Sequence, residues 1–136
     1  MIYFDSDFLI NYYVIQDRKR HQLAVKIFDK ANQNGEGFLS LLNLQEIAFV
    51  LSKLRVDIVE INDTLHTFNK FNPINYSFED FKRAATLCQK VGFQNINDCI
   101  HIAIAETHCQ ELYTFNQADF KLIKNHTSLK INILIP

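Results

Sequence analysis

The sequence predicts an α/β domain with three layers, α/β/α, in which a small central parallel sheet lies between helices. Two observations favour this class. Short strand patterns and helix patterns alternate along the whole chain, which is typical of layered α/β domains rather than bundles or sandwiches. The chain has 136 residues, 48% of them apolar, which suits one domain over residues 1–136 and leaves no room for a second full domain.

The elements of the first half follow from local patterns. A hydrophobic start predicts the first strand, and apolar residues at three- and four-residue spacing predict the helices. Asn34-Gly35-Glu36-Gly37 is the clearest break in the sequence, and a short buried strand is expected after it. In order, we expect a strand at 1–4, helices at 7–14 and 21–33, a strand at 38–40, and helices at 42–54 and 57–71.

In the second half, punctuating residues set the boundaries. Asn72-Pro73 ends the preceding helix, Ser77 is suited to cap the next one with acids in its first turn, and Gly92 stops it. The following helix is rich in small residues, so it should pack closely and centrally. In order, we expect a brief strand at 74–76, helices at 77–91 and about 96–107, a strand at 111–114, a short helix at 119–124 and a closing strand at 131–135.

Charge and hydropathy limit the possible partners. A net charge of −1 and a pI near 6.5 argue against a protein that grips nucleic acid by bulk electrostatics, although a nuclease with an acidic pocket remains compatible. The run Arg18-Lys19-Arg20-His21 is either a local phosphate contact or a solvated loop between two helices. No apolar run is long enough to span a bilayer and no signal peptide is visible, so we expect a cytoplasmic protein without a membrane segment.

The three cysteines are expected to be buried free thiols. Cys88, Cys99 and Cys109 are odd in number and lie in or beside helical patterns, so a disulfide framework is not favoured. A zinc site from Cys99, His101, His108 and Cys109 is the alternative. It lacks a C-x-x-C pair, and Cys99 and His101 point to different faces of a helix.

The chemistry-bearing pattern is a series of acids at strand ends and helix starts. Asp5 follows the first strand directly, and open α/β sheets place their ligands at that end of a strand. Glu46, Asp98 and the segment 114–120, which contains Asn116 and Asp119, repeat the arrangement. If the fold gathers these residues, they form an acidic pocket for a divalent metal.

Each of these acids has an ordinary structural explanation when it is taken alone. Asp98 after Asn97 resembles a helix cap, and Asp7 is suited to cap the first helix. Glu46 is typical of a solvated helix residue, and Asp119 can simply start the last short helix. Only their joint occurrence favours a pocket.

Taken together, the four segments resemble the motifs of the PIN domain family in order, spacing and total length. The resemblance covers essentially the whole chain and implies a PIN-like, Rossmann-like fold. It rests on Asp5-Ser6-Asp7-Phe8-Leu9-Ile10 after the first strand, Leu44-Gln45-Glu46-Ile47 early in a helix, Asn97-Asp98-Cys99-Ile100-His101-Ile102-Ala103-Ile104-Ala105 at a helix start, and Thr114-Phe115-Asn116-Gln117-Ala118-Asp119-Phe120 after the fourth strand.

The resemblance implies a metal-dependent endoribonuclease, most often the toxin of a VapBC-type toxin-antitoxin pair. Such proteins are commonly homodimers that cut cellular RNA and are silenced by a small antitoxin. One position departs from the pattern, because the fourth acidic position is Asn116 here, with Asp119 nearby as a substitute or supporting group.

Physical chemistry gives the same expectation for the cofactor. Carboxylates about 4 Å apart repel by roughly 4 kcal/mol per pair at an effective dielectric near 20, and a hard cation removes that cost. Oxygen ligands favour Mg²⁺ or Mn²⁺ over zinc. We expect Asp5 and Asp98 to bind the metal, with Glu46 acting through water or as a base. Four further residues are expected to assist: Thr114 and Asn116, which would orient water or phosphate, and Ser6 and Asp7.

Two other functions are open at this point. The Asp5-x-Asp7 pair also suits a haloacid-dehalogenase-like phosphatase with Asp5 as nucleophile, although no downstream lysine and Gly-Asp-rich motif is evident near Asp98. A non-catalytic PIN-fold binding protein that has lost its metal through Asn116 is the second. We expect the nuclease.

Overall fold

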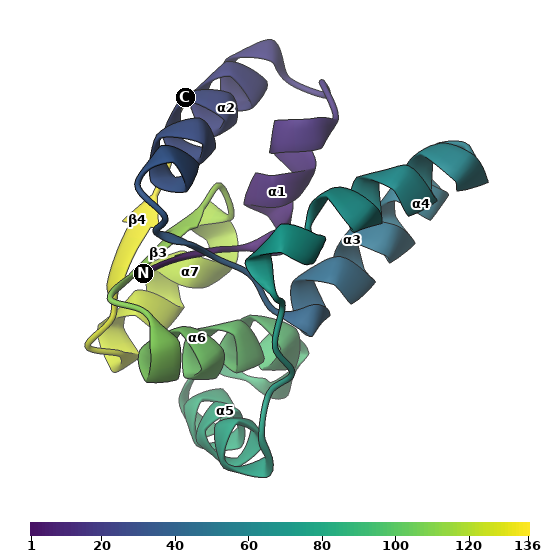
Figure 1. The fold of residues 1–136 in the computed structure, drawn as a ribbon. Coiled ribbons are helices and arrows are strands. Elements are labelled where there is room, and N and C mark those ends of the chain that lie inside the picture. Colours follow the sequence, from purple (N-terminus) through teal and green to yellow (C-terminus); the bar gives the residue numbers. More distant parts are fainter.

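A four-stranded parallel sheet with the strand order β2-β1-β3-β4 forms the centre of the molecule (Figure 1). The computed structural model describes all residues from 1 to 136. β1 pairs with β2 on one side and with β3 on the other, so it is an inner strand. The strands are β1 (Ile2–Phe4), β2 (Gly37–Phe38), β3 (Glu111–Thr114) and β4 (Lys130–Ile133).

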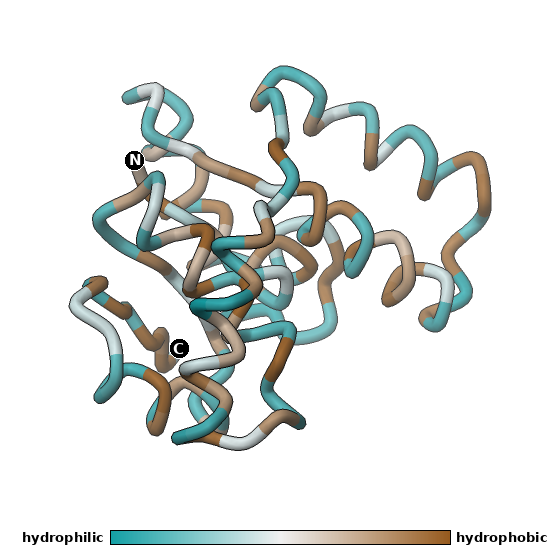
Figure 2. Tube along the Cα trace, turned by 90° about the horizontal axis from the view of Figure 1, so that it is seen from below, coloured by the Kyte–Doolittle hydropathy of each residue, from teal (hydrophilic) through white to brown (hydrophobic).

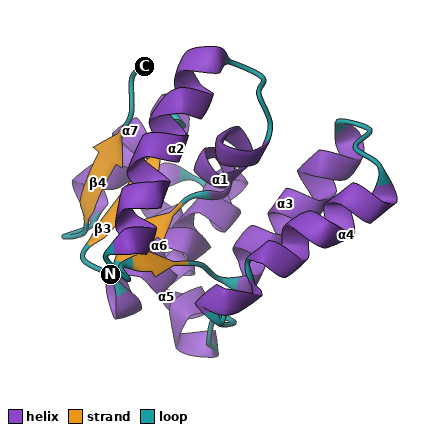
Figure 3. Cartoon of the chain, turned by 45° about the horizontal axis from the view of Figure 1, so that its top comes forward, coloured by secondary structure: helices purple, strands orange, loops and turns teal.

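Helices cover both faces of this sheet, which confirms the predicted three layers (Figure 3). Successive side chains of a strand point to opposite faces. Tyr3 accordingly packs mainly with α5, α6 and α7, and Phe4 packs mainly with α1, α2 and α3. The helices are α1 (Ser6–Tyr13), α2 (Arg18–Gln33), α3 (Leu41–Lys53), α4 (Ile58–Thr67), α5 (Phe78–Val91), α6 (Ile96–His108) and α7 (Gln117–Ile123), with 3₁₀ turns η1 (Asn69–Phe71), η2 (Phe93–Asn95) and η3 (Lys124–His126).

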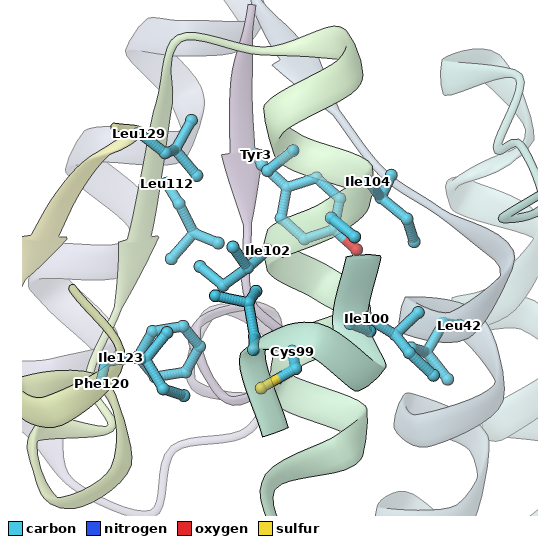
Figure 4. Close-up of a cluster of buried hydrophobic side chains, with 14 of the residues drawn as sticks. Tyr3, Leu42, Cys99, Ile100, Ile102, Ile104, Leu112, Phe120, Ile123 and Leu129 are labelled. Carbon is cyan, nitrogen blue, oxygen red and sulfur yellow. The ribbon is translucent and has the colours of Figure 1, made fainter. Parts of the chain in front are cut away.

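The small-residue helix α6 is buried as expected. All residues from 99 to 105 are buried, including His101. Figure 4 shows Ile102 and Ile104 of α6 in the same cluster as Tyr3 and Leu112 from the strands. Fully burying one such isoleucine contributes about 1.5–3 kcal/mol, so this cluster fixes α6 firmly against the sheet.

Several helix boundaries differ from the predicted ones because the capping residues differ. Asp5, not Asp7, caps α1, and its Oδ1 accepts a hydrogen bond from Ser6 N at 2.9 Å. α2 begins at Arg18, three residues earlier than expected, because Asp17 caps it through Arg20 N at 2.9 Å. The basic run is therefore the first helical turn, and the expectation of a loop there is wrong.

Further corrections concern the later segments. The helix expected at 57–71 divides into α4 and η1, and the strand expected at 74–76 is reduced to one bridge between Ser40 and Ile74. α7 begins at Gln117 because Asn116, not Asp119, is its cap. The predicted ends of α5 are confirmed: Ser77 forms a reciprocal capping box, and Gly92 stops the helix with a φ of +99°.

α3 and α4 form a hairpin that extends away from the sheet in Figures 1 and 3. Hydrophobic and hydrophilic residues alternate along this hairpin (Figure 2). Phe49, Ile58 and Val59 on it are largely exposed. No helix of the chain is long and apolar enough to cross a membrane. All three cysteines are free and buried, as predicted.

Candidate active site

Asp5 is fixed at the carboxyl end of the inner strand β1. Its backbone N–H donates to the carbonyl of Tyr113 at 3.0 Å, so Asp5 lies beside the end of β3. Its carboxylate is only 4% exposed and accepts hydrogen bonds from Ser6 N at 2.9 Å and from the Thr114 hydroxyl at 2.8 Å. The predicted ligand is therefore buried and held rigidly where two adjacent parallel strands end.

Glu46 projects from the second turn of α3 into the same region and is ion-paired with a histidine. His101 Nε2 donates to Glu46 Oε1 at 2.5 Å, and the Ser6 hydroxyl donates to the same oxygen at 2.6 Å. Asn97 donates to the other carboxylate oxygen at 3.3 Å. Burial acts to raise the pKa of Glu46, but these partners, His101 foremost, outweigh it and lower the pKa. Glu46 is thus half-buried and held by three side-chain partners.

His101 of α6 is completely buried between carboxylates on one side and a tyrosine on the other. Its Nε2 lies 3.9 Å from Asp5 Oδ1, and its Nδ1 is 2.5 Å from the Tyr3 hydroxyl. Burial acts to lower the pKa of His101, but the hydrogen bond to Glu46 and the charges of Asp5, Glu46 and Asp98 raise it overall. The carboxylates around His101 thus favour its protonated, positively charged form.

A chain of hydrogen bonds supports the histidine from behind. The Tyr3 hydroxyl is 2.7 Å from the Ser40 hydroxyl, which donates to Asn43 Oδ1 at 3.2 Å. Asn43 Nδ2 in turn donates to the Ser6 hydroxyl at 3.0 Å. Burial is the main reason that the pKa of Tyr3 is raised well above its ordinary value, so Tyr3 remains a neutral donor. The chain links β1, the starts of α1 and α3 and the middle of α6 into one rigid support.

Asp98 lies in the first turn of α6 and does not cap that helix, which begins after Asn95. Burial, followed by the charge of Asp5, raises the pKa of Asp98 to about 8, while the charge of His101 acts in the opposite direction. Glu46 and Asp119 contribute smaller effects of the same sign as Asp5. The structure thus brings Asp98 into the electrostatic range of Asp5, and a cation between them would relieve the repulsion.

Asp7 and Thr114 border the centre on the β3 side. Asp7 Oδ1 accepts hydrogen bonds from the Thr114 hydroxyl at 3.2 Å and from Phe115 N at 3.3 Å. Burial, followed by the charge of Asp5, raises the pKa of Asp7 to about 8. Thr114 is fully buried and joins Asp5 to Asp7, so its hydroxyl positions both carboxyl groups.

Asn116 and Asp119 are partners of each other. Asn116 Nδ2 donates to Asp119 Oδ2 at 2.9 Å, and Asn116 Oδ1 accepts from Asp119 N at 3.2 Å. The Asn116 backbone N–H donates to Thr114 Oγ1 at 2.9 Å. The fourth acidic position of the pattern is thus a helix cap tied to a neighbouring acid, so its carbonyl oxygen already has a partner.

The basic run is exposed, and its three residues are not equivalent. The Arg20 guanidinium lies over the Phe115 ring, 5.7 Å from its centroid, and lines a pocket together with Asp7 and Asn116. Arg18 and Lys19 are exposed on the first turn of α2 and line no such pocket. Only Arg20 is therefore brought next to the acidic residues.

The donor set fits a hard divalent cation better than zinc. No group of three or more His, Cys, Asp or Glu side chains lies at coordinating distance, so neither the acids nor Cys99, His101, His108 and Cys109 form a closed cage. Asp98 takes part in none of the hydrogen bonds of the centre, and Asp5 keeps unused lone pairs, whereas the Nε2 of His101 is committed to Glu46. The available ligands are therefore carboxylate oxygens, as Mg²⁺ and Mn²⁺ prefer.

The family of the chain is shown by sequence comparison. The PIN domain profile matches residues 2–125, which covers nearly all of the chain and every residue of the acidic centre described above. The chain belongs to the PIN domain family. PIN domains have a nuclease-type fold and typically bind a divalent metal. No curated protein matches the sequence. The PIN assignment gives no support to the phosphatase alternative.

Sequence reasoning missed the role of His101 in this PIN domain. His101 was considered only as a zinc ligand, whereas it pairs with Glu46 and contacts Tyr3. The signal was available, because His101 follows Asp98 by three residues and both therefore lie on one side of α6. A histidine inside an otherwise apolar, buried helix needs polar partners, and the acids are the nearest ones.

Proposed function

We propose that this PIN domain is a Mg²⁺- or Mn²⁺-dependent endoribonuclease and the toxin component of a type II toxin-antitoxin system. The observation that carries the proposal is that Asp5, at the carboxyl end of β1, and Glu46 lie 3.9 and 2.5 Å from the same nitrogen of His101, and that both carboxylates act on Asp98 by raising its pKa. The family supports a nuclease, and the resemblance to VapC-type toxins supports the finer role.

In this proposal, Asp5 and Asp98 would hold the cation, and Glu46 would support the site through water or act as a base. A bound divalent cation acidifies a water molecule and offsets negative charge on the scissile phosphate. His101 orients Glu46 and favours its ionised form, so its carboxylate would be available to accept a proton from the attacking water. Thr114 and Ser6 hold Asp5 and Glu46 in place. His101 is completely buried, so it does not contact the RNA and acts through the carboxylates around it.

The direct test uses Asp5→Asn, which keeps the cap of α1 and the size of the side chain. The purified protein should cleave single-stranded RNA in the presence of Mg²⁺ or Mn²⁺, and the variant should lose at least a hundredfold in rate with an unchanged circular dichroism spectrum. The same variant should relieve growth arrest when the protein is expressed. Equal cleavage by parent and variant would point to a contaminating nuclease and contradict the proposal.

The predicted partners, a small antitoxin and a second copy of the chain, are part of this proposal. The largely exposed Phe49, Ile58 and Val59 on the α3–α4 hairpin give either partner an apolar surface. A neighbouring upstream reading frame encoding a DNA-binding head and a disordered tail would support the antitoxin. Co-expression should then protect the cells, and light scattering should report the mass of the complex.

A non-catalytic PIN-fold binding protein is the second candidate, because specific contacts favour it. The charge of Glu46 is already balanced by the hydrogen-bonded His101, and the Asn116 side chain already donates to Asp119. Titration calorimetry with Mn²⁺ separates the two candidates. A nuclease should release or absorb heat that is lost in Asp98→Asn, whereas a binding protein should give no heat at millimolar metal.

A further inference from the structure

A polar pocket borders the acidic centre on the α7 side. It has a volume of about 500 Å³, which lies within the range of small-molecule sites. Asp7, Asn116 and Arg20 of α2 line it, and Asp7 is joined to Asp5 of the centre through the Thr114 hydroxyl. In Figures 1 and 3, α1 lies between α7 and α3. Asp5 of the centre caps α1 and Asp7 lies in its first turn, so the pocket adjoins the centre at the start of this helix. An RNA strand that crosses the centre would pass this pocket.

Arg20 is free to bind an anion. None of the ion pairs in the structure involves Arg20, although its side chain is exposed. The buried ring of Phe115 lies beneath the guanidinium and limits its freedom, as cation–π packing does. A planar guanidinium held in this way matches a phosphate better than a flexible ammonium would.

The remaining lining suits a nucleoside. The Gln117 side chain is an amide that can pair with a base edge, and Leu134 and Ile135 offer an apolar wall against which a base or ribose can pack. Asp7 also lines the pocket, with its Oδ1 held by hydrogen bonds from the Thr114 hydroxyl and Phe115 N, and Arg20 is the one cationic side chain of the lining.

We infer that this pocket binds one nucleotide of the RNA strand next to the scissile phosphate, with Arg20 on the phosphate and the Gln117 amide on the base. The inference rests on the proposed ribonuclease function and deepens it. The inference also assigns different roles within the basic run: Arg20 would contact the RNA phosphate, whereas Arg18 and Lys19 do not line this pocket.

Binding is tested without cleavage. In EDTA, adenosine 5′-monophosphate and uridine 5′-monophosphate are titrated into ¹⁵N-labelled protein and followed by NMR. We expect chemical-shift changes at the Arg20 Nε–H, the Gln117 side-chain amide and the Ile135 backbone amide. In Arg20→Ala, the changes at Gln117 and Ile135 should be lost. The inference is overturned if no shifts appear, if they are centred elsewhere on the protein, or if inorganic phosphate alone gives equal shifts.

The contribution to RNA recognition is tested with a matched control. Lys26→Ala removes an exposed cation from the same helix but outside this pocket. For a ten-nucleotide single-stranded RNA, Arg20→Ala should raise KM about tenfold with kcat within twofold, and Lys26→Ala should change neither. The slope of log K against log salt should fall by about 0.7 in Arg20→Ala only.

The two proposals fail in different ways. If the parent protein cleaves no RNA but binds the mononucleotides at Arg20, the ribonuclease assignment is wrong and the pocket stands. If the parent cleaves RNA while Arg20→Ala and Lys26→Ala behave alike, the pocket inference is wrong and the ribonuclease assignment stands.

Discussion

Glu46 and His101 are joined by a 2.5 Å hydrogen bond between Oε1 and Nε2, with the imidazole completely buried and 26% of the glutamate side chain exposed. A carboxylate expected to serve a metal thus already has a cation supplied by the protein. The pair stabilises the negative charge in an acidic region, and it orients Glu46 toward Ser6 and Asn97.

Removing His101 should be costly. In His101→Ala, Glu46 and Asp5 lose the nearest positive charge, and the Tyr3 hydroxyl loses a partner, so we expect the free energy of unfolding to fall by about 3 kcal/mol. His101→Gln should cost less, because its amide can still donate to Glu46. Urea denaturation measures both, with the exposed His66→Gln as control. A loss below about 0.5 kcal/mol in His101→Ala would show that the pair contributes nothing net.

A second ion pair predicts how stability depends on pH. Arg83 donates to both carboxylate oxygens of Glu106, at 2.9 and 3.0 Å, and the Thr127 hydroxyl donates to Glu106 Oε2 at 2.7 Å. Burial acts to raise the pKa of Glu106, but the Arg83 and Thr127 hydrogen bonds outweigh it and lower the pKa. Because the folded-state pKa is below the unfolded one, this contribution is present above the ordinary glutamate pKa and is lost as pH falls through the folded value.

Glu106→Gln should therefore lower the free energy of unfolding by about 1 kcal/mol at pH 7 and by less near pH 3. Denaturant titrations at the two pH values measure the difference. Glu79→Gln, which breaks an exposed pair with Lys82, should change little at either pH. Equal costs for Glu106→Gln at both pH values would contradict the pKa argument.

The sequence predicts the sheet and the acids well because each depends on local pattern. The strand at residues 1–4 and the carboxylate after it are read from hydrophobicity and position alone, and Asp5 is where that pattern puts it. The helix boundaries are less predictable because two neighbouring acids compete for one cap. Both Asp5 and Asp7 can cap α1, and only the pairing of Asp7 with Thr114 and Phe115 decides between them.

The contacts of His101 are not predictable from local pattern, because they join residues distant in sequence. Its partner Glu46 is 55 residues away and Tyr3 is 98 residues away. The sequence shows that a buried histidine needs polar partners, but only the packing of α6 against β1 and α3 selects them. The same holds for Arg20, which reaches Phe115 through the packing of α2 near the end of β3.

The departure at Asn116 gives a prediction of its own. Asn116→Asp removes the amide donor to Asp119 and places a second carboxylate beside it, so the variant should lose about 1–2 kcal/mol of unfolding free energy without metal. Asn116→Asp combined with Asp119→Asn should recover most of that loss, because an amide donor is restored. Thermal denaturation of the four proteins measures the coupling. Additive effects of the two substitutions would show that the side chains are independent.

Metal binding should reverse a pH effect that originates at Asp98. Its folded-state pKa of about 8 is above the ordinary 3.8, so without metal the folded protein binds more protons between these values and its stability falls as pH rises through that window. A cation binds the ionised carboxylate of the folded protein, and the ionised fraction increases as pH rises toward 8. The stabilisation by the cation therefore increases with pH. Mn²⁺ should therefore raise Tm more at pH 8 than at pH 6, by several degrees at metal concentrations a hundredfold above Kd.

Asp98→Asn should flatten the metal-free pH dependence of stability and abolish most of the Mn²⁺ effect on Tm. The substitution Asp63→Asn, at an exposed position on α4, should leave both unchanged. An undiminished Mn²⁺ shift in Asp98→Asn would mean that the cation binds elsewhere on the protein.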